Sequence, residues 1–220
     1  MKTSETMTER AITELVFLLD RSGSMAGLET DTIGGFNAVL EQHRRQPGQA
    51  VLSTVLFDHE TLVLHDRVDL QLVRPLTRDD YSVRGSTALL DAVGGAIKHI
   101  ARVQRYLPGG FKPGKTIFVV TTDGMENASR RYSYEDVKRL IGEREEQGWE
   151  FLFLGANIDA AKEARRMGIP VARAAQYVAD CQGSEVMFEA VAQATCNLRE
   201  QQVLSDDWSD AIADDFAGRG

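Results

Sequence analysis

The sequence has few cysteines and no long apolar run. Cys181 and Cys196 are the two cysteines among 220 residues, too few for a disulfide framework and without the spacing of a metal site. No apolar run approaches the roughly 20 residues that span a bilayer, and the first ten residues lack the apolar core of a signal peptide. These absences predict a cytoplasmic protein with reduced thiols.

Positive charge is also scarce. The chain carries 25 lysines and arginines against 33 aspartates and glutamates, a net charge of -8. Sequence-independent binding to nucleic acid or to an anionic membrane needs a basic surface, so we expect neither partner. Hydrophobic residues make up 43% and charged residues 26%, which is typical of a globular protein. The length suits a single domain with one sizeable core.

Short apolar runs alternate with amphipathic segments along most of the chain. Residues 14–20, 116–123 and 149–157 are almost wholly apolar, as strands buried on both faces of a parallel sheet are. Residues 171–179 form a weaker strand pattern. The runs 50–58 and 60–69 are separated by little more than His59, and such a short connection requires an antiparallel hairpin.

Apolar residues recur at helical spacing between these runs. The predicted helices cover 28–45, 87–107, 134–148, 159–168 and 184–202. Ser133 with Asp136 fits a capping box, and Asp159 is a candidate N-cap. Strands alternating with helices predict a doubly wound, Rossmann-like α/β fold with a mostly parallel sheet, one antiparallel edge strand and helices on both faces.

Polar side chains lie at the carboxyl ends of two predicted strands. One apolar run ends in Asp20 and continues into Ser22 and Ser24, another ends at Asp123, and Thr87 lies where a loop enters a helix. Ligands bind at this edge of an open parallel sheet. Carboxylate and hydroxyl oxygens suit Mg²⁺ or Mn²⁺, and no nearby His or Cys offers the ligands that zinc prefers. The sequence therefore predicts a metal site of these five residues.

The stretch DRSGSM, Thr87 in RGSTAL and Asp123 in TTDG resemble the metal-ion-dependent adhesion site of von Willebrand factor type A domains. The order and spacing of all five positions match, and the resemblance covers roughly residues 12–180, as in small stand-alone bacterial or phage members. It implies that the hydroxyls of Ser22, Ser24 and Thr87 ligate a divalent cation directly. The cation would be Mg²⁺, with Mn²⁺ or Ca²⁺ as alternatives. Asp20 and Asp123 would act largely through water or as hydrogen-bond acceptors.

The resemblance also implies a function. Neutral hydroxyl ligands leave most of the cation's charge uncompensated, so the cation attracts a Glu or Asp carboxylate of a partner protein. Small cytoplasmic members often work beside AAA+ ATPases or as assembly components. We therefore expect a metal-dependent docking module rather than an enzyme.

Two other functions remain open. Asp20 could be the nucleophile of a Mg²⁺-dependent phosphotransferase or phosphatase, although the second acidic residue of that family would fall on Ser22. A scaffold with a purely structural metal is the third possibility. The four histidines are scattered and suggest no Ser-His-Asp arrangement.

Several polar residues near the predicted site have both a functional and an ordinary interpretation. Asp91 could hydrogen-bond to the metal loop or could interact with the helix dipole, and the sequence does not decide between them. The loop after Asp123 could contact a partner or, as we favour, be a solvated loop; its charged and polar residues are Glu126, Asn127, Arg130 and Arg131.

The stretch GGFKPGKT (109–116) matches the sequence pattern of a phosphate-binding loop. Such a loop follows a strand and leads into a helix, whose N-terminus holds the phosphates. Here a helix precedes the stretch and a strand follows it. Pro113 also removes a backbone donor. We therefore expect a helix-to-strand turn that binds no nucleotide.

We divide the chain into an N-terminal extension (1–11), a domain (12–204) and an acidic C-terminal tail (205–220). The tail contains five aspartates and ends in small residues, so we expect it to be mobile or dependent on a partner. Its carboxylates raise the hypothesis that the tail occupies the metal site, against the simpler interpretation of a solubilising tail.

Overall fold

Six strands form one sheet within residues 12–219, the part of the chain that the computed structural model describes. The strand order is β3-β2-β1-β4-β5-β6, and all neighbours are parallel except β2 and β3. The predicted mostly parallel sheet with an antiparallel hairpin at its edge is confirmed. The strands are β1 (Thr13–Asp20), β2 (Ala50–Phe57), β3 (Thr61–Asp69), β4 (Lys115–Thr122), β5 (Glu150–Ala156) and β6 (Ala174–Tyr177).

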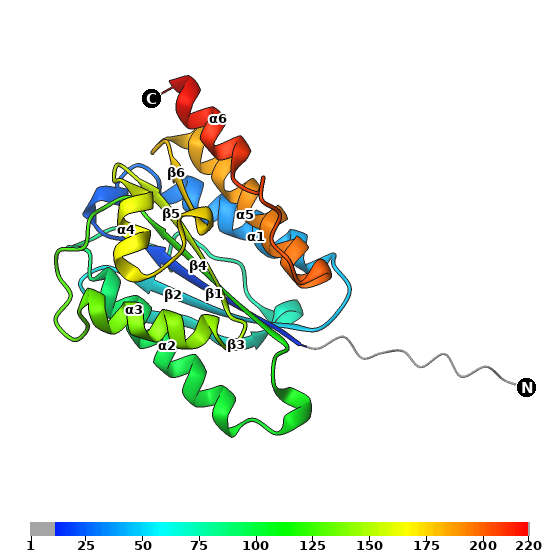
Figure 1. Ribbon diagram of the computed structural model, residues 1–220. Helices are drawn as coiled ribbons and strands as arrows, with labels where there is room; N and C mark the ends of the chain where they lie inside the picture. Colours follow the sequence, from blue (N-terminus) through cyan, green and yellow to red (C-terminus); the bar gives the residue numbers. More distant parts are fainter. Residues whose placement is uncertain (1–11, 220) are drawn as a thin grey trace, which may run out of the picture.

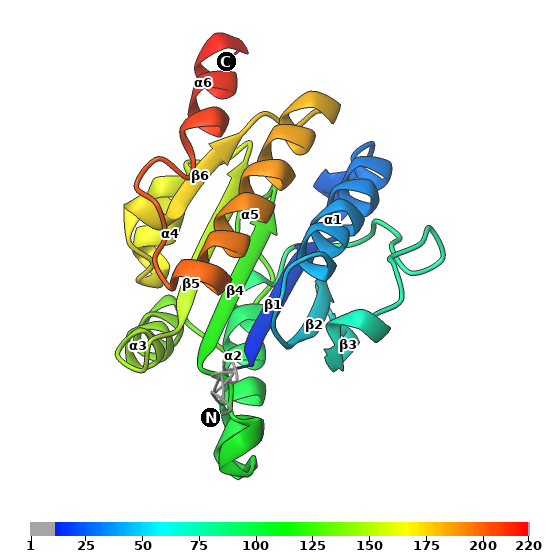
Figure 2. The same cartoon turned by 90° about the vertical axis from the view of Figure 1, so that its right-hand side faces the viewer.

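Helices cover both faces of the sheet (Figures 1 and 2). One face carries α1 (Glu29–Arg44), α5 (Cys181–Gln201) and α6 (Asp210–Arg219), and the other carries α2 (Leu89–Tyr106), α3 (Tyr134–Glu145) and α4 (Ala160–Met167). Because successive strand residues point to opposite faces, Phe17 belongs to the first core and Leu18 to the second. None of the helices within residues 12–219 combines the length and apolar character needed to cross a membrane.

Helix starts follow the capping residues. The Ser133 and Asp136 side chains each accept the other's backbone N–H, which is the predicted capping box. Asp159 caps α4 by accepting from the Lys162 N–H at 2.8 Å. The helix predicted from residue 184 begins at Cys181 instead, because the Asp180 carboxylate accepts from the Gly183 N–H at 2.7 Å. Asp180 is the capping signal that the apolar spacing alone missed.

The acidic C-terminal segment is not a mobile tail within the described residues. Residues 210–219 form α6, and Ile212 is 1% exposed in the core beside α5 and β6. The Trp208 indole N–H donates to the Ala172 carbonyl at 2.8 Å, and Arg219 pairs with Asp180 at 2.6 Å. The expectation of mobility is therefore wrong for residues 205–219. Trp208, in the turn before α6, and Ile212, in α6, are both buried within the run of aspartates.

The stretch GGFKPGKT connects α2 to β4, in the predicted order of helix, turn and strand. Lys115 begins β4 and lies 3.1 Å from Glu150 at the amino edge of the sheet. Asp123 follows the other end of the same strand. The stretch and the predicted metal site are therefore at opposite edges of the sheet.

Candidate metal centre

Three loops meet at the carboxyl edge of the sheet. Asp20 ends β1 and Asp123 follows β4, and these two strands are parallel neighbours. Thr87 lies two residues before α2, in a loop whose Gly85 carbonyl accepts from the Gly23 N–H at 3.0 Å. The fold thus brings together the five residues that the sequence predicts to hold a metal.

The three hydroxyl groups converge beside Gly124. Ser22 Oγ lies 3.1 Å from Ser24 Oγ. A Cβ atom on Gly124 would lie 2.9 Å from Ser24 Oγ, 3.2 Å from Thr87 Oγ1 and 3.9 Å from Ser22 Oγ. Any side chain at this position would therefore enter the space that the hydroxyls surround, which accounts for a glycine immediately after Asp123.

Asp20 is fully buried and its two carboxylate oxygens have different partners. Oδ1 accepts from the Ser22 N–H at 2.7 Å, and Oδ2 accepts from the Thr122 hydroxyl at 2.5 Å. Burial raises the pKa of Asp20 to about 6, the hydrogen bonds from Thr122 and Ser22 oppose this, and the Asp123 charge adds to it. Tyr81 fixes the same residue from the other side by donating to its backbone carbonyl. The sequence analysis missed Thr122 and Tyr81.

Asp123 has one carboxylate oxygen with a partner and one without. Oδ1 accepts from the Ser24 hydroxyl at 2.6 Å. Oδ2 is buried and accepts no hydrogen bond from the residues of the structure. Burial raises the pKa of Asp123. An unpaired buried carboxylate oxygen is energetically costly, so this atom is the clearest indication that a cation belongs here.

The loop after Asp123 holds the Thr87 loop in place. The Thr87 N–H donates to Asn127 Oδ1 at 2.9 Å, and the Thr87 carbonyl accepts from the Asn127 N–H at 3.0 Å. Glu126 Oε2 accepts from the Leu90 N–H at 2.9 Å, in the first turn of α2. Glu126 and Asn127 are therefore structural residues that position Thr87, rather than members of a freely solvated loop.

Asp91 also binds backbone groups. Its carboxylate accepts from the N–H groups of Arg130, Arg131 and Tyr132 at 3.1, 2.8 and 3.0 Å. Although burial raises its pKa, these three hydrogen bonds dominate and hold the pKa of Asp91 below its usual value. Asp91 thus anchors the segment that leads into α3 and does not reach the metal loop itself.

Asp58 joins two of the metal loops and was missed by the sequence analysis. Its side chain is fully buried, and its Oδ2 lies 3.0 Å from Arg21 Nε and accepts from Arg84 Nε at 2.9 Å. The Arg84 N–H also donates to the Arg21 carbonyl at 2.9 Å. Arg21 lies between Asp20 and Ser22, so Asp58 ties the Ser22 loop to the loop that carries Thr87. Asp58 follows the carboxyl end of β2, beside β1, and this position could have identified it from the sequence as a residue near the site.

Asp58, His59 and Glu60 place their ligand atoms within 4.8 Å of one another, as a metal cluster would. Guanidinium groups already neutralise these carboxylates: Arg84 contacts Asp58 at 2.9 Å and Glu60 at 2.6 Å. Arg21 adds a second positive charge at Asp58. We therefore assign the cluster to loop positioning, and the five predicted residues remain the candidate metal ligands.

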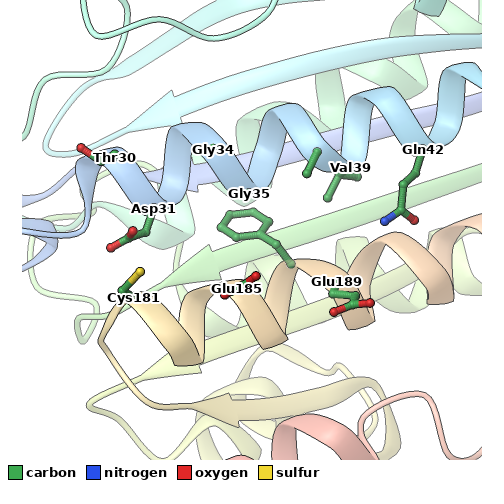
Figure 3. A pocket seen from close by; sticks show the side chains of 11 residues that line it. Thr30, Asp31, Gly34, Gly35, Val39, Gln42, Cys181, Glu185 and Glu189 are labelled. Carbon is green, nitrogen blue, oxygen red and sulfur yellow. The ribbon is translucent and has the colours of Figure 1, made fainter.

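A groove of about 370 Å³ separates α1 from α5 (Figure 3). Gly35 allows the two helices to approach, because a Cβ there would lie 2.1 Å from the Phe188 ring. Asp31 and Cys181 face each other at one end of the groove. The hydrogen bond and charge of Asp31 raise the pKa of the Cys181 thiol, which disfavours the reactive thiolate. The groove offers acidic groups but no converging ligand set comparable to that at Gly124.

No family model matches the sequence, and no curated protein sequence matches it either. Solved structures share its fold. The von Willebrand factor domain of the type V pili tip protein Mfa5 from Porphyromonas gingivalis superposes with a TM-score of 0.60 at 10% identity, covering 86% of this chain and 96% of that one. A von Willebrand factor type A protein from Catenulispora acidiphila gives 0.57 at 15% identity, covering 85% and 43%.

A third similar structure is proximal thread matrix protein 1 from the mussel byssus, with a zinc-occupied metal-ion-dependent adhesion site. Its TM-score is 0.60 at 13% identity, with 85% of this chain and 46% of the mussel protein covered. This chain thus spans less than half of the mussel and Catenulispora proteins. At these identities the likeness concerns the fold, and the chain has the fold of von Willebrand factor type A domains.

Proposed function

We propose that this chain is a metal-dependent protein-binding module, with a divalent cation held by Asp20, Ser22, Ser24, Thr87 and Asp123. One observation carries the proposal: three hydroxyl oxygens from two loops surround the space beside Gly124, next to the buried Asp123 Oδ2 that has no hydrogen-bond partner in the described chain.

Mg²⁺ fits the donor set best, and Mn²⁺ or Ca²⁺ also suit it, because all five side chains offer hard oxygen atoms. The nitrogen and sulfur ligands that zinc prefers do not occur among these five residues. A cation here would stabilise the charged forms of Asp20 and Asp123, opposing the effect of burial on both pKa values.

The partner that we propose offers a Glu or Asp side chain. A cation held largely by neutral hydroxyls would keep the charge and a coordination position to bind such a carboxylate. The approach is open, because Gly23, Ser24 and Ser86 are exposed and Met125 is 69% exposed beside the site. A cytoplasmic, bacterial or phage setting and a partner such as an AAA+ ATPase or an assembly component belong to the proposal on the resemblance alone.

The environment of Asp20 favours binding over phosphoryl transfer. A nucleophile must reach its substrate, but Asp20 has no exposed surface and both carboxylate oxygens accept hydrogen bonds, from Ser22 and Thr122. These contacts support a role in positioning the Ser22 loop. We therefore propose no catalytic function for this site.

Titration calorimetry with MgCl₂ and MnCl₂ tests the metal site. The wild-type chain should bind one cation, and Ser22→Ala/Ser24→Ala should abolish binding. The matched control Ser82→Ala/Ser86→Ala removes two exposed hydroxyls of the neighbouring loop and should bind normally. Equal binding by both double variants would refute the assignment.

The docking function requires a second measurement, in which proteins retained by the immobilised chain are compared with and without EDTA. Retention that depends on the metal and is lost in Asp123→Ala is expected. Mg²⁺-dependent hydrolysis of a phosphate ester that is abolished by Asp20→Asn would instead show an enzyme.

A further inference from the structure

A basic segment interrupts the acidic sequence. Residues 92–122 contain five lysines and arginines and no aspartate or glutamate, in a chain whose net charge is -8. This segment includes most of α2, the loop that contains GGFKPGKT, and β4. In the structure, the end of α2 and the loop after it extend past the amino edge of the sheet, away from the metal site (Figures 1 and 2).

A pocket of about 360 Å³ lies at this edge, between the ends of α2 and α3 and the loop that joins α2 to β4. Three positively charged side chains line it, one from each of these segments, together with two side-chain amides, of which that of Gln104 already donates to Glu14 and Thr116. The cations are Arg105, Lys112 and Arg144, and the amides are those of Gln104 and Gln147.

Two of the three cations of the pocket have no ion pair among the described residues. Arg105 and Lys112 form no ion pair with any residue that the structure describes. Arg144 is oriented by its neighbours: its guanidinium lies 5.7 Å from the centre of the Trp149 ring, donates to Gln147 Oε1 at 2.7 Å and lies 3.5 Å from the Glu143 carboxylate. Its Nε is buried and has no hydrogen-bond partner in the described chain. The three cations around one pocket, two of them without an ion pair, favour an anionic ligand.

Two aromatic side chains that neighbour the cations in the sequence are exposed. Tyr106 follows Arg105 and is 76% exposed, and Phe111 precedes Lys112 and is 62% exposed. Exposed aromatic side chains next to arginine are enriched in protein interfaces. A ligand that contacted both kinds of group would combine carboxylates with apolar side chains.

We propose that these residues, Arg105, Tyr106, Phe111, Lys112 and Arg144, form a second docking surface that binds an acidic segment of a partner protein, in which Glu or Asp alternates with apolar residues. A bound phosphate is less suited to the site. The loop precedes a strand and therefore offers no helix N-terminus, and Pro113 has no N–H to donate. The surface lies at the opposite edge from Asp123, so it requires no metal and leaves the metal site free.

Nuclear magnetic resonance can test the surface without the metal site. The full ¹⁵N-labelled chain is titrated in EDTA with the synthetic peptide acetyl-EFELE-amide, and with acetyl-QFQLQ-amide as the uncharged control. We expect the acidic peptide to shift amide signals of residues 101–114 and 144–147, and the control peptide to leave them unchanged. Raising NaCl from about 0.02 M to about 0.5 M should weaken the binding, because salt screens exposed charges.

Variants separate this surface from general charge effects. Arg105→Gln/Lys112→Gln should weaken binding of the acidic peptide about two- to thirtyfold, the loss expected for two exposed ion pairs. Lys162→Gln/Arg165→Gln removes two exposed charges of α4 and should leave binding unchanged. Ser22→Ala/Ser24→Ala should also bind the peptide normally, so the result does not depend on the metal site.

Three outcomes would overturn the proposal. The first is a set of shifts centred on residues 20–24 and 123–127, and the second is equal binding of the two peptides. The third concerns a titration with sodium pyrophosphate. If the amide signals of residues 101–114 and 144–147 shifted with pyrophosphate but not with the acidic peptide, the site would bind small phosphate compounds instead.

Discussion

Ser24 Oγ lies 2.6 Å from Asp123 Oδ1, although 99 positions separate the two residues in the sequence. The contact joins the loop after β1 to the loop after β4, and it leaves Asp123 Oδ2 buried without a hydrogen-bond partner among residues 12–219. The arrangement satisfies one carboxylate oxygen and leaves the other to a ligand. A cation is the ligand that we propose there, because its charge complements an unpaired carboxylate oxygen.

Asp123→Asn should therefore abolish metal binding without lowering the stability of the metal-free protein. Mg²⁺ should raise the melting temperature of the wild-type chain, because a ligand that binds only the folded state stabilises it. The variant should show no such rise. In EDTA its melting temperature should equal or exceed that of the wild type, because a costly buried charge is removed. Differential scanning fluorimetry measures both, and a clear loss of stability in EDTA would contradict the account.

Gly124→Ala should weaken metal binding on the order of tenfold, as changes that displace metal ligands do. The added methyl would lie 2.9 Å from Ser24 Oγ and 3.2 Å from Thr87 Oγ1, so the hydroxyls must move apart. Gly109→Ala is the matched control, since its Cβ would have no atom within 4 Å. Calorimetric titration with MnCl₂ compares the two variants, and unchanged affinity in Gly124→Ala would place the cation elsewhere.

Asp58→Asn should weaken metal binding and destabilise the fold together. Removal of the charge leaves Arg21 buried without its carboxylate partner, a change that costs about 3–5 kcal/mol in buried ion pairs. The Thr87 loop should also lose its fixed position relative to Ser22. Chemical denaturation in EDTA measures the first effect and calorimetry the second.

A double-mutant cycle identifies the positioning role of Asp58. If the carboxylate acts through Arg84, the effects of Asp58→Asn and Arg84→Gln on metal affinity should not add. Asp66→Asn, at an exposed aspartate that contacts His99, is the control and should have no effect on affinity. Additive losses would mean that Asp58 acts on the site independently of Arg84, and an unchanged affinity in Asp58→Asn would mean that it does not position the site.

The sequence predicted the sheet and the five candidate ligands because both depend on local patterns. Apolar runs such as residues 14–20 are buried on both faces and therefore nearly continuous, and a parallel sheet places the residues after its strands at one edge. Asp20 and Asp123 could be matched from their position alone. The hairpin followed from the short connection around His59.

The surroundings of the site could not be predicted, because they depend on contacts between distant segments. Asp58 meets Arg84 across 26 positions, and Asn127 meets Thr87 across 40. Neither pair has a local signature, since a charged residue in a loop is usually solvated. The order of residues 205–219 was missed for a related reason: the acidic composition concealed the two apolar residues, Trp208 and Ile212, that dock the segment.

Ile212→Ala should lower the free energy of unfolding of the whole domain by about 2–4 kcal/mol, the usual cost of truncating a buried isoleucine. Ile212 is 1% exposed against the core formed with α5 and β6, so the loss should appear in a single cooperative transition. Asp214→Ala, at an exposed position of the same helix, should change the stability little. If both variants unfolded like the wild type, α6 would not contribute to the fold.

His43 should make the protein less stable in acid. Burial, with a smaller contribution from the Arg199 charge, lowers the pKa of His43 from 6.5 to about 3. Below pH 6.5 the unfolded chain therefore takes up a proton that the folded chain does not. Above pH 6.5 this difference does not lower the free energy of unfolding. Between pH 6.5 and pH 3, His43 should lower the free energy of unfolding by about 1.4 kcal/mol for each pH unit.

The neighbours of His43 explain why protonation is resisted. His43 Nε2 lies 2.9 Å from Thr195 Oγ1, and Nδ1 lies 3.1 Å from the Arg199 guanidinium. Nδ1 thus accepts from Arg199 and cannot carry a proton without losing that bond. Urea denaturation between pH 4 and pH 7.5 should show a shallower pH dependence for His43→Gln than for wild type. His99→Gln, at an exposed histidine, should retain the steep slope, and equal slopes in all three proteins would rule out His43 as the source.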